Sequence, residues 1–254
     1  MTMTTLELDR ALRGLRLSGM TATLQVRALQ VSQHELSFID AFGALVQDEL
    51  DRRKSRLLER RFALSGLPER KDLKDFDFSY NPLLPKRDLM QLAALNFIDA
   101  KENALFIGRP GTGKSHLAKA MAQLAVARGY TVIYREAHTL IDDLHQAREL
   151  GDKKQRGTFN NADLLVIDDL FLRKLPDTAG DALADLLMHR YEKHATLITT
   201  NRPIDDWGQI LGDVVLVAPL LDRLMHHGHL LKFEGKSWRL KHAAERLAKQ
   251  NQTA

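Results

Sequence analysis

The chain has 254 residues, 44% of them hydrophobic and 28% charged, which suits one α/β domain of ordinary size with a smaller appendage. It contains no cysteine, so disulfides, thiol chemistry and cysteine-based zinc sites are excluded. The sequence shows neither a membrane-spanning apolar run nor the apolar core of a signal peptide, so we expect a cytoplasmic protein with no membrane partner.

The N-terminal part of the sequence has helical periodicity. Leucines and phenylalanines recur at helical spacing through residues 6–63, and we predict an all-α domain over residues 1–68 that contacts DNA or a partner. Its second helix is expected to start near Asp40 and to continue through the basic run of residues 52–61. That run holds six Lys or Arg side chains and one Glu.

A change in composition marks a linker, which we place at residues 69–88. Phe76, Phe78 and Tyr80 alternate with polar residues inside it. These aromatic rings either stack on an adenine base or anchor the linker to the domain surface, and the sequence leaves both possibilities open.

Residues 89–254 alternate between buried strands and amphipathic helices, which predicts a domain of the α/β class. Its five parallel strands should carry helices on both faces, and a short C-terminal helix should end the chain. The candidate strands are Ala104–Ile107, Thr131–Arg135, Leu164–Asp168, Thr196–Thr200 and Leu230–Phe233.

The segment between the first of these strands and the next helix fits the phosphate-loop pattern G-x-x-x-x-G-K-[ST] at every fixed position. Backbone N–H groups of such a loop converge on phosphates, and the following helix adds its positive end. Lys114 is expected at the outer phosphates of ATP, and the Ser115 hydroxyl at Mg²⁺. The predicted nucleotide-binding residues are Gly108, Arg109, Pro110, Gly111, Thr112, Gly113, Lys114 and Ser115.

Polar residues at the ends of later elements complete a candidate hydrolytic site. Asp168 and Asp169 end an apolar strand, which suits a Mg²⁺ ligand followed by a residue that polarises water. Asn201 follows the next strand and is expected to orient water or contact the γ-phosphate. An arginine can stabilise charge on the transferred phosphoryl group. Arg223 is a candidate for this role from a neighbouring subunit, and Arg239 from the same chain.

The resemblance to a known family rests on five motifs in this order: GRPGTGKS, LLVIDDL, TTNRP, LLDRL and GKSWR. Together they resemble the AAA+ ATPases of the helicase-loader clade. The segments LRLSGM, KDLKDFDFSYNP and ENALFIGRPGTGKSHLAKA are similar, more narrowly, to IstB-like proteins, the ATPase helpers encoded beside a transposase in bacterial insertion sequences.

The resemblance implies roles for single residues and for the whole chain. Asn201 corresponds to a sensor at a strand tip, Arg223 to a finger acting in trans, and Arg239 to a second sensor in cis. The family further implies a P-loop ATPase that assembles on duplex DNA as a homo-oligomer with ATP sites shared between subunits. It also implies remodelling of that DNA and recruitment and stimulation of a cognate transposase.

Three basic clusters, in residues 52–61, 145–158 and 232–254, support a nucleic-acid partner, although a single basic run is more often a solvated helix face. We expect sequence-tolerant DNA contacts from Arg52, Arg53, Lys54, Lys153, Lys154, Arg173 and Lys174. Two other functions stay open: a DnaC-like replicative helicase loader, and a small-molecule kinase with the same phosphate loop. A kinase needs a lid and an acceptor pocket but no arginine from a second subunit.

Overall fold

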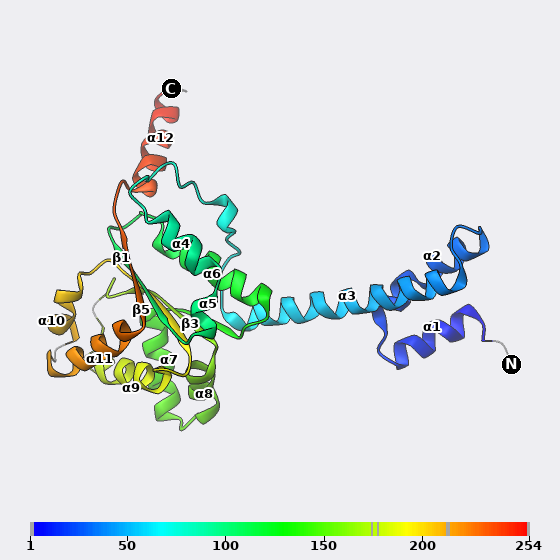
Figure 1. Cartoon of the computed structure of the whole chain (residues 1–254), viewed down its shortest axis with the longest axis horizontal. Helices are drawn as coiled ribbons and strands as arrows, with labels where there is room; N and C mark the ends of the chain where they lie inside the picture. Colours follow the sequence, from blue (N-terminus) through cyan, green and yellow to red (C-terminus); the bar gives the residue numbers. More distant parts are fainter. Residues whose placement is uncertain (1–2, 174, 177, 212–213, 253–254) are drawn as a thin grey trace. The chain divides into compact units, whose positions relative to one another are not determined.

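The computed structural model describes residues 3–173, 175, 176, 178–211 and 214–252, and chain contacts divide it into two compact units. The units are Met1–Arg60 and Arg61–Ala254, and the boundary falls within one long helix, α3 (Phe38–Ser65) (Figure 1). The functional division into residues 1–68, 69–88 and 89–254 stays a prediction.

The first unit consists of helices joined by close backbone contact. α1 (Thr5–Gly14) precedes α2 (Ser18–Ser32), which packs against α3 at Gly19. A Cβ at Gly19 would lie 2.6 Å from the Cα of Glu49, so only glycine fits there. The Gly19 N–H also donates a hydrogen bond to the buried Glu49 carboxylate, which fixes α2 on this part of α3.

The second unit is built on a parallel sheet with the strand order β2-β3-β4-β1-β5. Strand β1 lies between β4 and β5, with Phe106 opposite Thr199 on one side and Leu231 on the other. The predicted five-stranded α/β architecture is therefore confirmed. The strands are β1 (Asn103–Gly108), β2 (Val132–Glu136), β3 (Leu164–Leu170), β4 (Ala195–Thr200) and β5 (Gly228–Phe233).

Helices cover both faces of the sheet. Successive strand residues point to opposite faces, and apolar residues occur on both. Phe106 and Val166 belong to the core on one face, whereas Leu105 and Ile167 belong to the core on the other. The first face is covered by α4 (Lys86–Ala93), α5 (Asn96–Asp99) and α6 (Lys114–Arg128). The second is covered by α7 (Ala137–Glu149), α8 (Lys153–Asn161), α9 (Ala179–Arg190), α10 (Trp207–Leu211) and α11 (Val214–His226).

The segment that precedes α4 packs against the core of the second unit. Leu67 and Leu84 are buried in the core on the α6 face, and Phe78 packs against that core. A short 3-10 turn, η1 (Leu73–Asp75), lies between them. The chain ends in α12 (Trp238–Gln252), as predicted. No helix in the described part of the chain is both long and apolar enough to cross a membrane.

Candidate nucleotide-binding site

The loop between β1 and α6 bends sharply at the carboxyl end of β1. Gly111 and Gly113 have φ angles of 78° and 104°, in the left-handed region that side-chain-bearing residues adopt only with strain. A Cβ at Gly113 would also lie 2.5 Å from a ring carbon of Phe76. Glycine is therefore required here on two grounds, and the loop presents the free N–H groups at the start of α6 to the pocket beside it.

Lys114 is buried under this loop and its ammonium group is held by backbone oxygens. The Nζ atom donates hydrogen bonds to the carbonyls of Gly108 at 2.7 Å and Arg109 at 2.9 Å. Burial lowers the pKa of Lys114, and nearby Asp169 opposes this change. The six residues from Pro110 to Ser115 line the pocket, whereas Gly108 and Arg109 contribute the carbonyls that position Lys114.

Asp168 lies in the sheet behind the pocket wall. It is only 2% exposed, and both of its oxygens accept hydrogen bonds from hydroxyl groups. Tyr134 donates to Oδ2 and Thr199 donates to Oδ1, each at 2.5 Å. Each carboxylate oxygen has two lone pairs, so these hydrogen bonds leave acceptor capacity on Asp168, and its role as a Mg²⁺ ligand stays a prediction.

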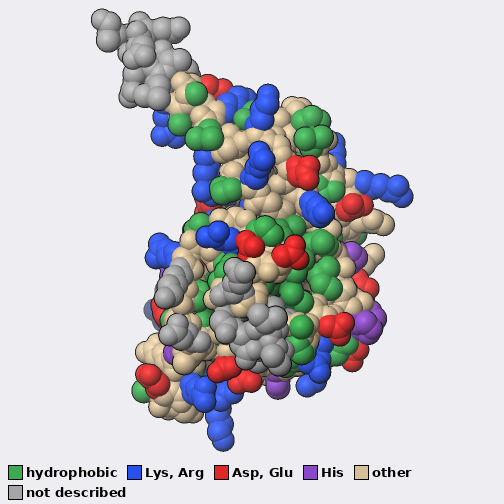
Figure 2. Space-filling model, turned by 90° about the vertical axis from the view of Figure 1, so that its left-hand side faces the viewer, with side chains coloured by type: hydrophobic (Ala, Val, Ile, Leu, Met, Phe, Trp, Pro, Cys, Tyr) green, Lys and Arg blue, Asp and Glu red, His purple; other side chains and the backbone are tan. Residues whose placement is uncertain are grey.

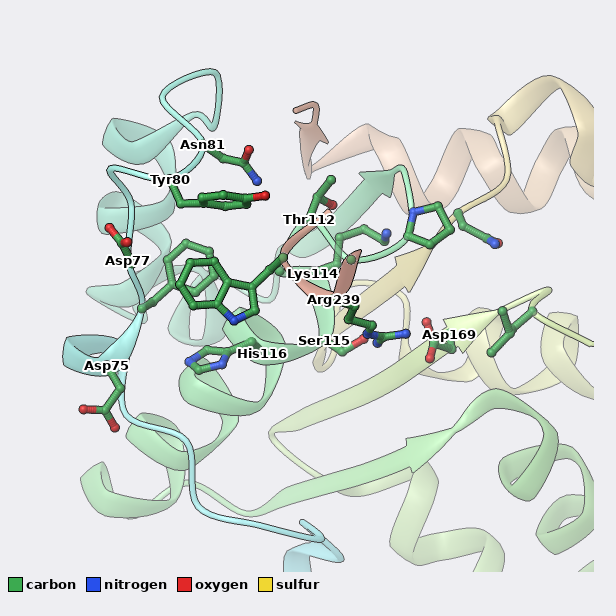
Figure 3. A pocket seen from close by; sticks show the side chains of 17 residues that line it. Asp75, Asp77, Tyr80, Asn81, Thr112, Lys114, Ser115, His116, Asp169 and Arg239 are labelled. Atoms are coloured by element: carbon green, nitrogen blue, oxygen red, sulfur yellow. The ribbon is translucent and has the colours of Figure 1, made fainter. Parts of the chain in front are cut away.

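Asp169 faces the pocket because the backbone of β3 is irregular at this point. Its φ is 54°, and the pairing of β3 with β4 shifts register between Ile167 and Leu170. Such strained conformations persist where the surrounding structure enforces them, and they cluster at functional sites. Burial and the neighbouring Asp168 raise the pKa of Asp169, whereas Lys114 lowers it. In Figure 3 the side chain of Arg239 lies between Ser115 and Asp169.

Asn201 directly follows β4, the strand that separates β1 from β3, and lines the same pocket. Its Oδ1 atom is buried and has no hydrogen-bond partner. Buried polar atoms are almost always hydrogen-bonded, so this acceptor fits a site that receives a polar ligand or water. The structure thus brings Lys114, Ser115, Asp169, Asn201 and Arg239 together, as the sequence predicted.

One wall of the pocket, whose volume is about 290 Å³, is formed by two segments that are far apart in sequence. The Asn81 side chain donates to the Lys236 carbonyl and accepts from the Lys236 N–H, each at 2.9 Å. The backbone N–H of Trp238 donates to the Gly111 carbonyl at 2.9 Å. The Trp238 ring packs edge-on against the Tyr80 ring, with 4.9 Å between the ring centroids. The C-terminal segment is thereby attached directly to the phosphate loop.

The aromatic residues of the predicted linker contact both the pocket and the domain core. Phe76 and Tyr80 line the pocket, and Phe76 and Phe78 pack against the core. Sequence reasoning assigned no role to Asn81, His116 or Trp238, which also line it. Trp238 precedes Arg239 in the GKSWR motif, and His116 follows Ser115 directly. Their positions next to predicted site residues could have indicated that they line the pocket.

Arg223 lies outside this pocket. Its Nη1 atom is 2.7 Å from the sulfur of Met188, and its guanidinium carbon is 5.9 Å from the Tyr191 ring centroid. Asn103 and Thr196, at the amino ends of β1 and β4, line the same small cavity as Arg223. The phosphate loop lies at the opposite, carboxyl edge of the sheet, so Arg223 is remote from the pocket of its own chain.

The residues predicted to contact DNA are exposed where the structure describes them, and they occur in both units. Arg52, Arg53 and Lys54 lie on α3, and Arg53 pairs with Glu49 at 2.7 Å. In the second unit, Lys153 and Lys154 begin α8, before β3, and Arg173 follows β3. Lys174 lies outside the described residues. Figure 2 shows Lys and Arg side chains spread among other kinds on the face in view.

Two curated proteins of insertion sequences are similar to this chain over nearly its whole length. An ATP-binding protein of insertion sequence IS5376 from Geobacillus stearothermophilus is 36% identical over 229 residues, which cover 89% of this chain and 91% of the relative. An insertion-sequence ATP-binding protein of Mycobacterium tuberculosis is 34% identical over 236 residues, covering 91% and 93%.

Solved structures share the fold of the second unit. A DNA replication initiation factor superposes with a TM-score of 0.56 at 24% identity, covering 73% of this chain and 56% of that one. The DnaC helicase loader gives 0.50 at 22% identity, covering 69% and 99%. The profile of the IstB-like ATP binding protein family matches residues 10–246, which confirms the family, fold and ATPase class expected from the sequence. The chain belongs to the IstB-like ATP-binding protein family.

Proposed function

We propose that this ATPase assembles on duplex DNA under the control of ATP, remodels that DNA, and recruits and stimulates the transposase of an insertion sequence. The observation that carries the proposal is the position of Arg223, which lies at the opposite edge of the sheet from the pocket lined by Lys114 and Asp169. An arginine so placed can reach a nucleotide only in a second copy of the chain. The relatives named as ATP-binding proteins of insertion sequences support the transposition setting.

The pocket residues fit a nucleoside triphosphate with Mg²⁺. The loop N–H groups and Lys114 would hold the phosphates, and the aromatic rings of Phe76, Tyr80 and Trp238 offer surfaces to the base. The Ser115 hydroxyl and the orphaned Asn201 oxygen are the polar groups at the position expected for the metal and its water. Mg²⁺ neutralises charge on the phosphate oxygens when it is bound.

Hydrolysis follows from the roles of four side chains. The Asp169 carboxylate accepts a proton from water while the water oxygen bonds to the γ-phosphorus and the bond to the ADP oxygen breaks. Asn201 orients that water through its free oxygen. Arg239 of the same chain and Arg223 of a second copy stabilise the charge that develops on the transferred group. Each site then requires two chains, which links hydrolysis to assembly.

Contacts to DNA are assigned to the basic residues of α3, the two lysines that begin α8, and Arg173. Lysine and arginine side chains on helices bind phosphates irrespective of base sequence, so we expect sequence-tolerant, salt-sensitive binding. A helicase loader would share the ATPase fold. The basic stretch of α3 favours duplex DNA as the partner of the first unit instead of a helicase ring.

Analytical ultracentrifugation with a duplex of random sequence tests the proposal. With ATP and Mg²⁺ the wild-type chain should sediment with DNA as an oligomer, whereas Lys114→Ala should remain monomeric. Arg87→Ala, which changes an exposed arginine of α4, is the matched control and should assemble normally. A wild-type monomer in the presence of ATP and DNA would contradict assembly. Capture of a replicative helicase in place of the transposase would favour the loader.

A further inference from the structure

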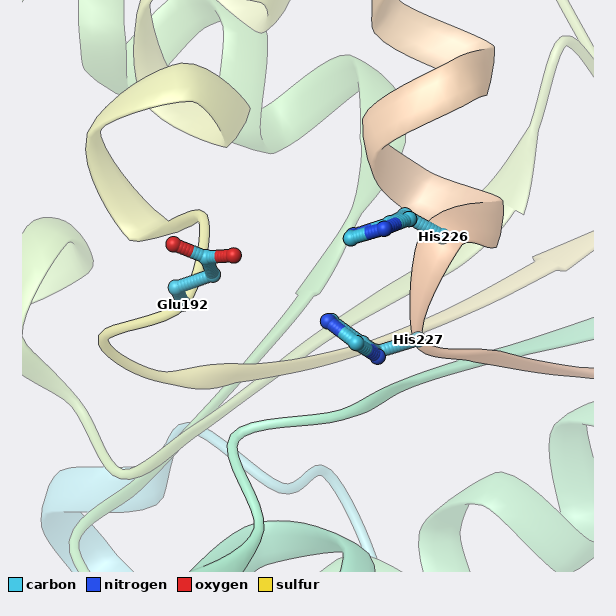
Figure 4. Close-up of side chains that lie close together, drawn as sticks. All are labelled: Glu192, His226 and His227. Carbon is cyan, nitrogen blue, oxygen red and sulfur yellow. The ribbon is translucent and has the colours of Figure 1, made fainter.

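Two turns on the amino edge of the sheet bring three exposed ligand side chains together. Glu192 lies in the turn between α9 and β4, His226 is the last residue of α11, and His227 lies between α11 and β5. One carboxylate oxygen and one nitrogen from each ring all lie within 4.8 Å of one another. In Figure 4 both rings and the carboxylate border a common space. No other trio of His, Cys, Asp or Glu has this spacing among the described residues.

The hydrogen bonds around the trio leave suitable lone pairs available. The Tyr191 hydroxyl is 3.0 Å from Nδ1 of His226. When its oxygen accepts from the Nδ1–H of His226, Nε2 of that ring carries a free lone pair. An outer hydrogen bond of this kind fixes the tautomer and orientation of metal-binding histidines.

The backbone and the surrounding dipoles also favour a cation here. Glu192 has a φ of 58°, a left-handed conformation that is rare for a residue with a long side chain, and it turns the chain between α9 and β4 at this point. His226 is the last residue of α11, where the helix dipole is negative. The His226 and His227 ring centroids are only 4.0 Å apart, so nitrogen atoms of both rings can approach one ion.

We propose that Glu192, His226 and His227 form a zinc site that joins the α9–β4 turn to the α11–β5 turn. Two imidazoles and a carboxylate are a common protein ligand set for zinc, with a fourth position left for water. Mg²⁺ prefers oxygen ligands in octahedral geometry and does not suit this set. Tetrahedral bonds of about 2.1 Å place ligand atoms about 3.4 Å apart, so exposed side chains need only small rotations from the present spacing.

Isothermal titration of the nucleotide-free full-length chain with Zn²⁺, in excess Mg²⁺, tests the site without depending on ATP hydrolysis. One Zn²⁺ per chain should bind the wild type, and the double change His226→Gln and His227→Gln should weaken binding at least about 100-fold. Tyr191→Phe, which removes only the outer hydrogen bond, should weaken it about 10-fold. His229→Gln is the matched control, because His229 is an exposed histidine 2.7 Å from a single carboxylate, that of Glu102.

Thermal unfolding provides a second measurement on the same proteins. Saturating Zn²⁺ should raise the Tm of the wild type and of His229→Gln, because a ligand that binds only the folded state stabilises it, and should leave the double variant unchanged. The proposal is overturned if the wild type binds Zn²⁺ no more tightly than the double variant, or if His229→Gln loses as much affinity. Neither result would bear on the ATP-dependent assembly, which is measured separately.

Discussion

Asn81 and Lys236 are joined by a pair of hydrogen bonds, each 2.9 Å long, in which one side-chain amide meets the backbone N–H and carbonyl of one residue. The residues are 155 positions apart in the chain. The contact holds the segment before α4 against the segment that leads into α12. Because the Trp238 N–H in turn bonds to Gly111, the phosphate loop and the helix that carries Arg239 are mechanically connected.

Asn81→Ala is expected to weaken ATP binding and to destabilise the fold. Asn81 is 5% exposed, and its removal leaves the N–H and carbonyl of Lys236 without partners at a cost of about 1–3 kcal/mol. Titration with a fluorescent ATP analogue and unfolding in urea measure the two effects. Asn96→Ala, at the start of the short helix α5, is a control elsewhere in the unit. Unchanged affinity in Asn81→Ala would show that the contact does not support the nucleotide site.

Asp169 should give the ATPase an acid limb above the pH expected for an ordinary aspartate. Burial and Asp168 raise its pKa above 3.8, and only the carboxylate form can accept a proton from water. The pH dependence of kcat/KM reports groups of the free enzyme, so it should fall as the pH decreases through the raised pKa. An acid limb at or below pH 3.8 would exclude Asp169 as the base.

Asp169→Asn separates catalysis from stability. We expect kcat to fall about 10²–10⁴-fold because the general base is lost. A carboxyl group whose folded-state pKa is raised contributes stability below its unfolded pKa, and this is lost as the pH rises through the folded pKa. At neutral pH the uncharged Asn avoids that loss and also tolerates the left-handed backbone. The free energy of unfolding in urea should therefore be equal to or higher than that of the wild type.

Thr199→Val tests the buried hydroxyl that connects the two carboxylate residues. The Thr199 hydroxyl donates to Asp168 and accepts from the Asp169 N–H at 2.9 Å. Valine has the same shape but can neither donate nor accept a hydrogen bond. The free energy of unfolding should therefore fall by about 1–3 kcal/mol, and hydrolysis should slow. Thr199→Ser keeps the hydroxyl and should retain most of the activity. Equal effects of Val and Ser would mean that packing, not hydrogen bonding, matters here.

Asn201→Ala should slow hydrolysis without destabilising the fold. The Oδ1 atom has no partner to lose, so the free energy of unfolding should change by no more than about 0.5 kcal/mol. The loss of a group that orients water should reduce kcat about 10²–10³-fold. Asn201→Asp retains an acceptor but no amide donor. Near-normal hydrolysis by Asn201→Asp would indicate contact with water, and a loss like that of Asn201→Ala would indicate contact with the γ-phosphate.

The sheet could be predicted from the sequence because its strands are short apolar runs. Leu164–Ile167 is buried on both faces and leads directly into the carboxylates, so strand and site were found together. Helix α8 could not be predicted in this way, since its sequence is polar and contains a glycine. Only Phe159 anchors it in the core, and the Asp152 side chain caps its first N–H groups.

The walls of the site could not be predicted, because they depend on contacts between remote segments. Nothing in the local sequence of β2 indicates that Tyr134 bonds to Asp168. Likewise, nothing in the sequence around Asn81 indicates that it bonds to Lys236. Local patterns identified the side chains that face the nucleotide, such as Lys114 and Asp169. The residues that orient those side chains became apparent only from the folded chain.

The central claim is that each ATP site combines Lys114 of one chain with Arg223 of another, and mixing two inactive variants tests it most directly. Asp169→Asn and Arg223→Ala should each lose hydrolysis when assayed alone on duplex DNA, and both retain Lys114 for ATP-dependent assembly. In an equimolar mixture, about a quarter of the head-to-tail interfaces should pair an intact Asp169 with an intact Arg223. ATPase activity should therefore recover to about that fraction of the wild-type rate. No recovery in mixtures that co-assemble, or normal hydrolysis by Arg223→Ala alone, would contradict the shared site.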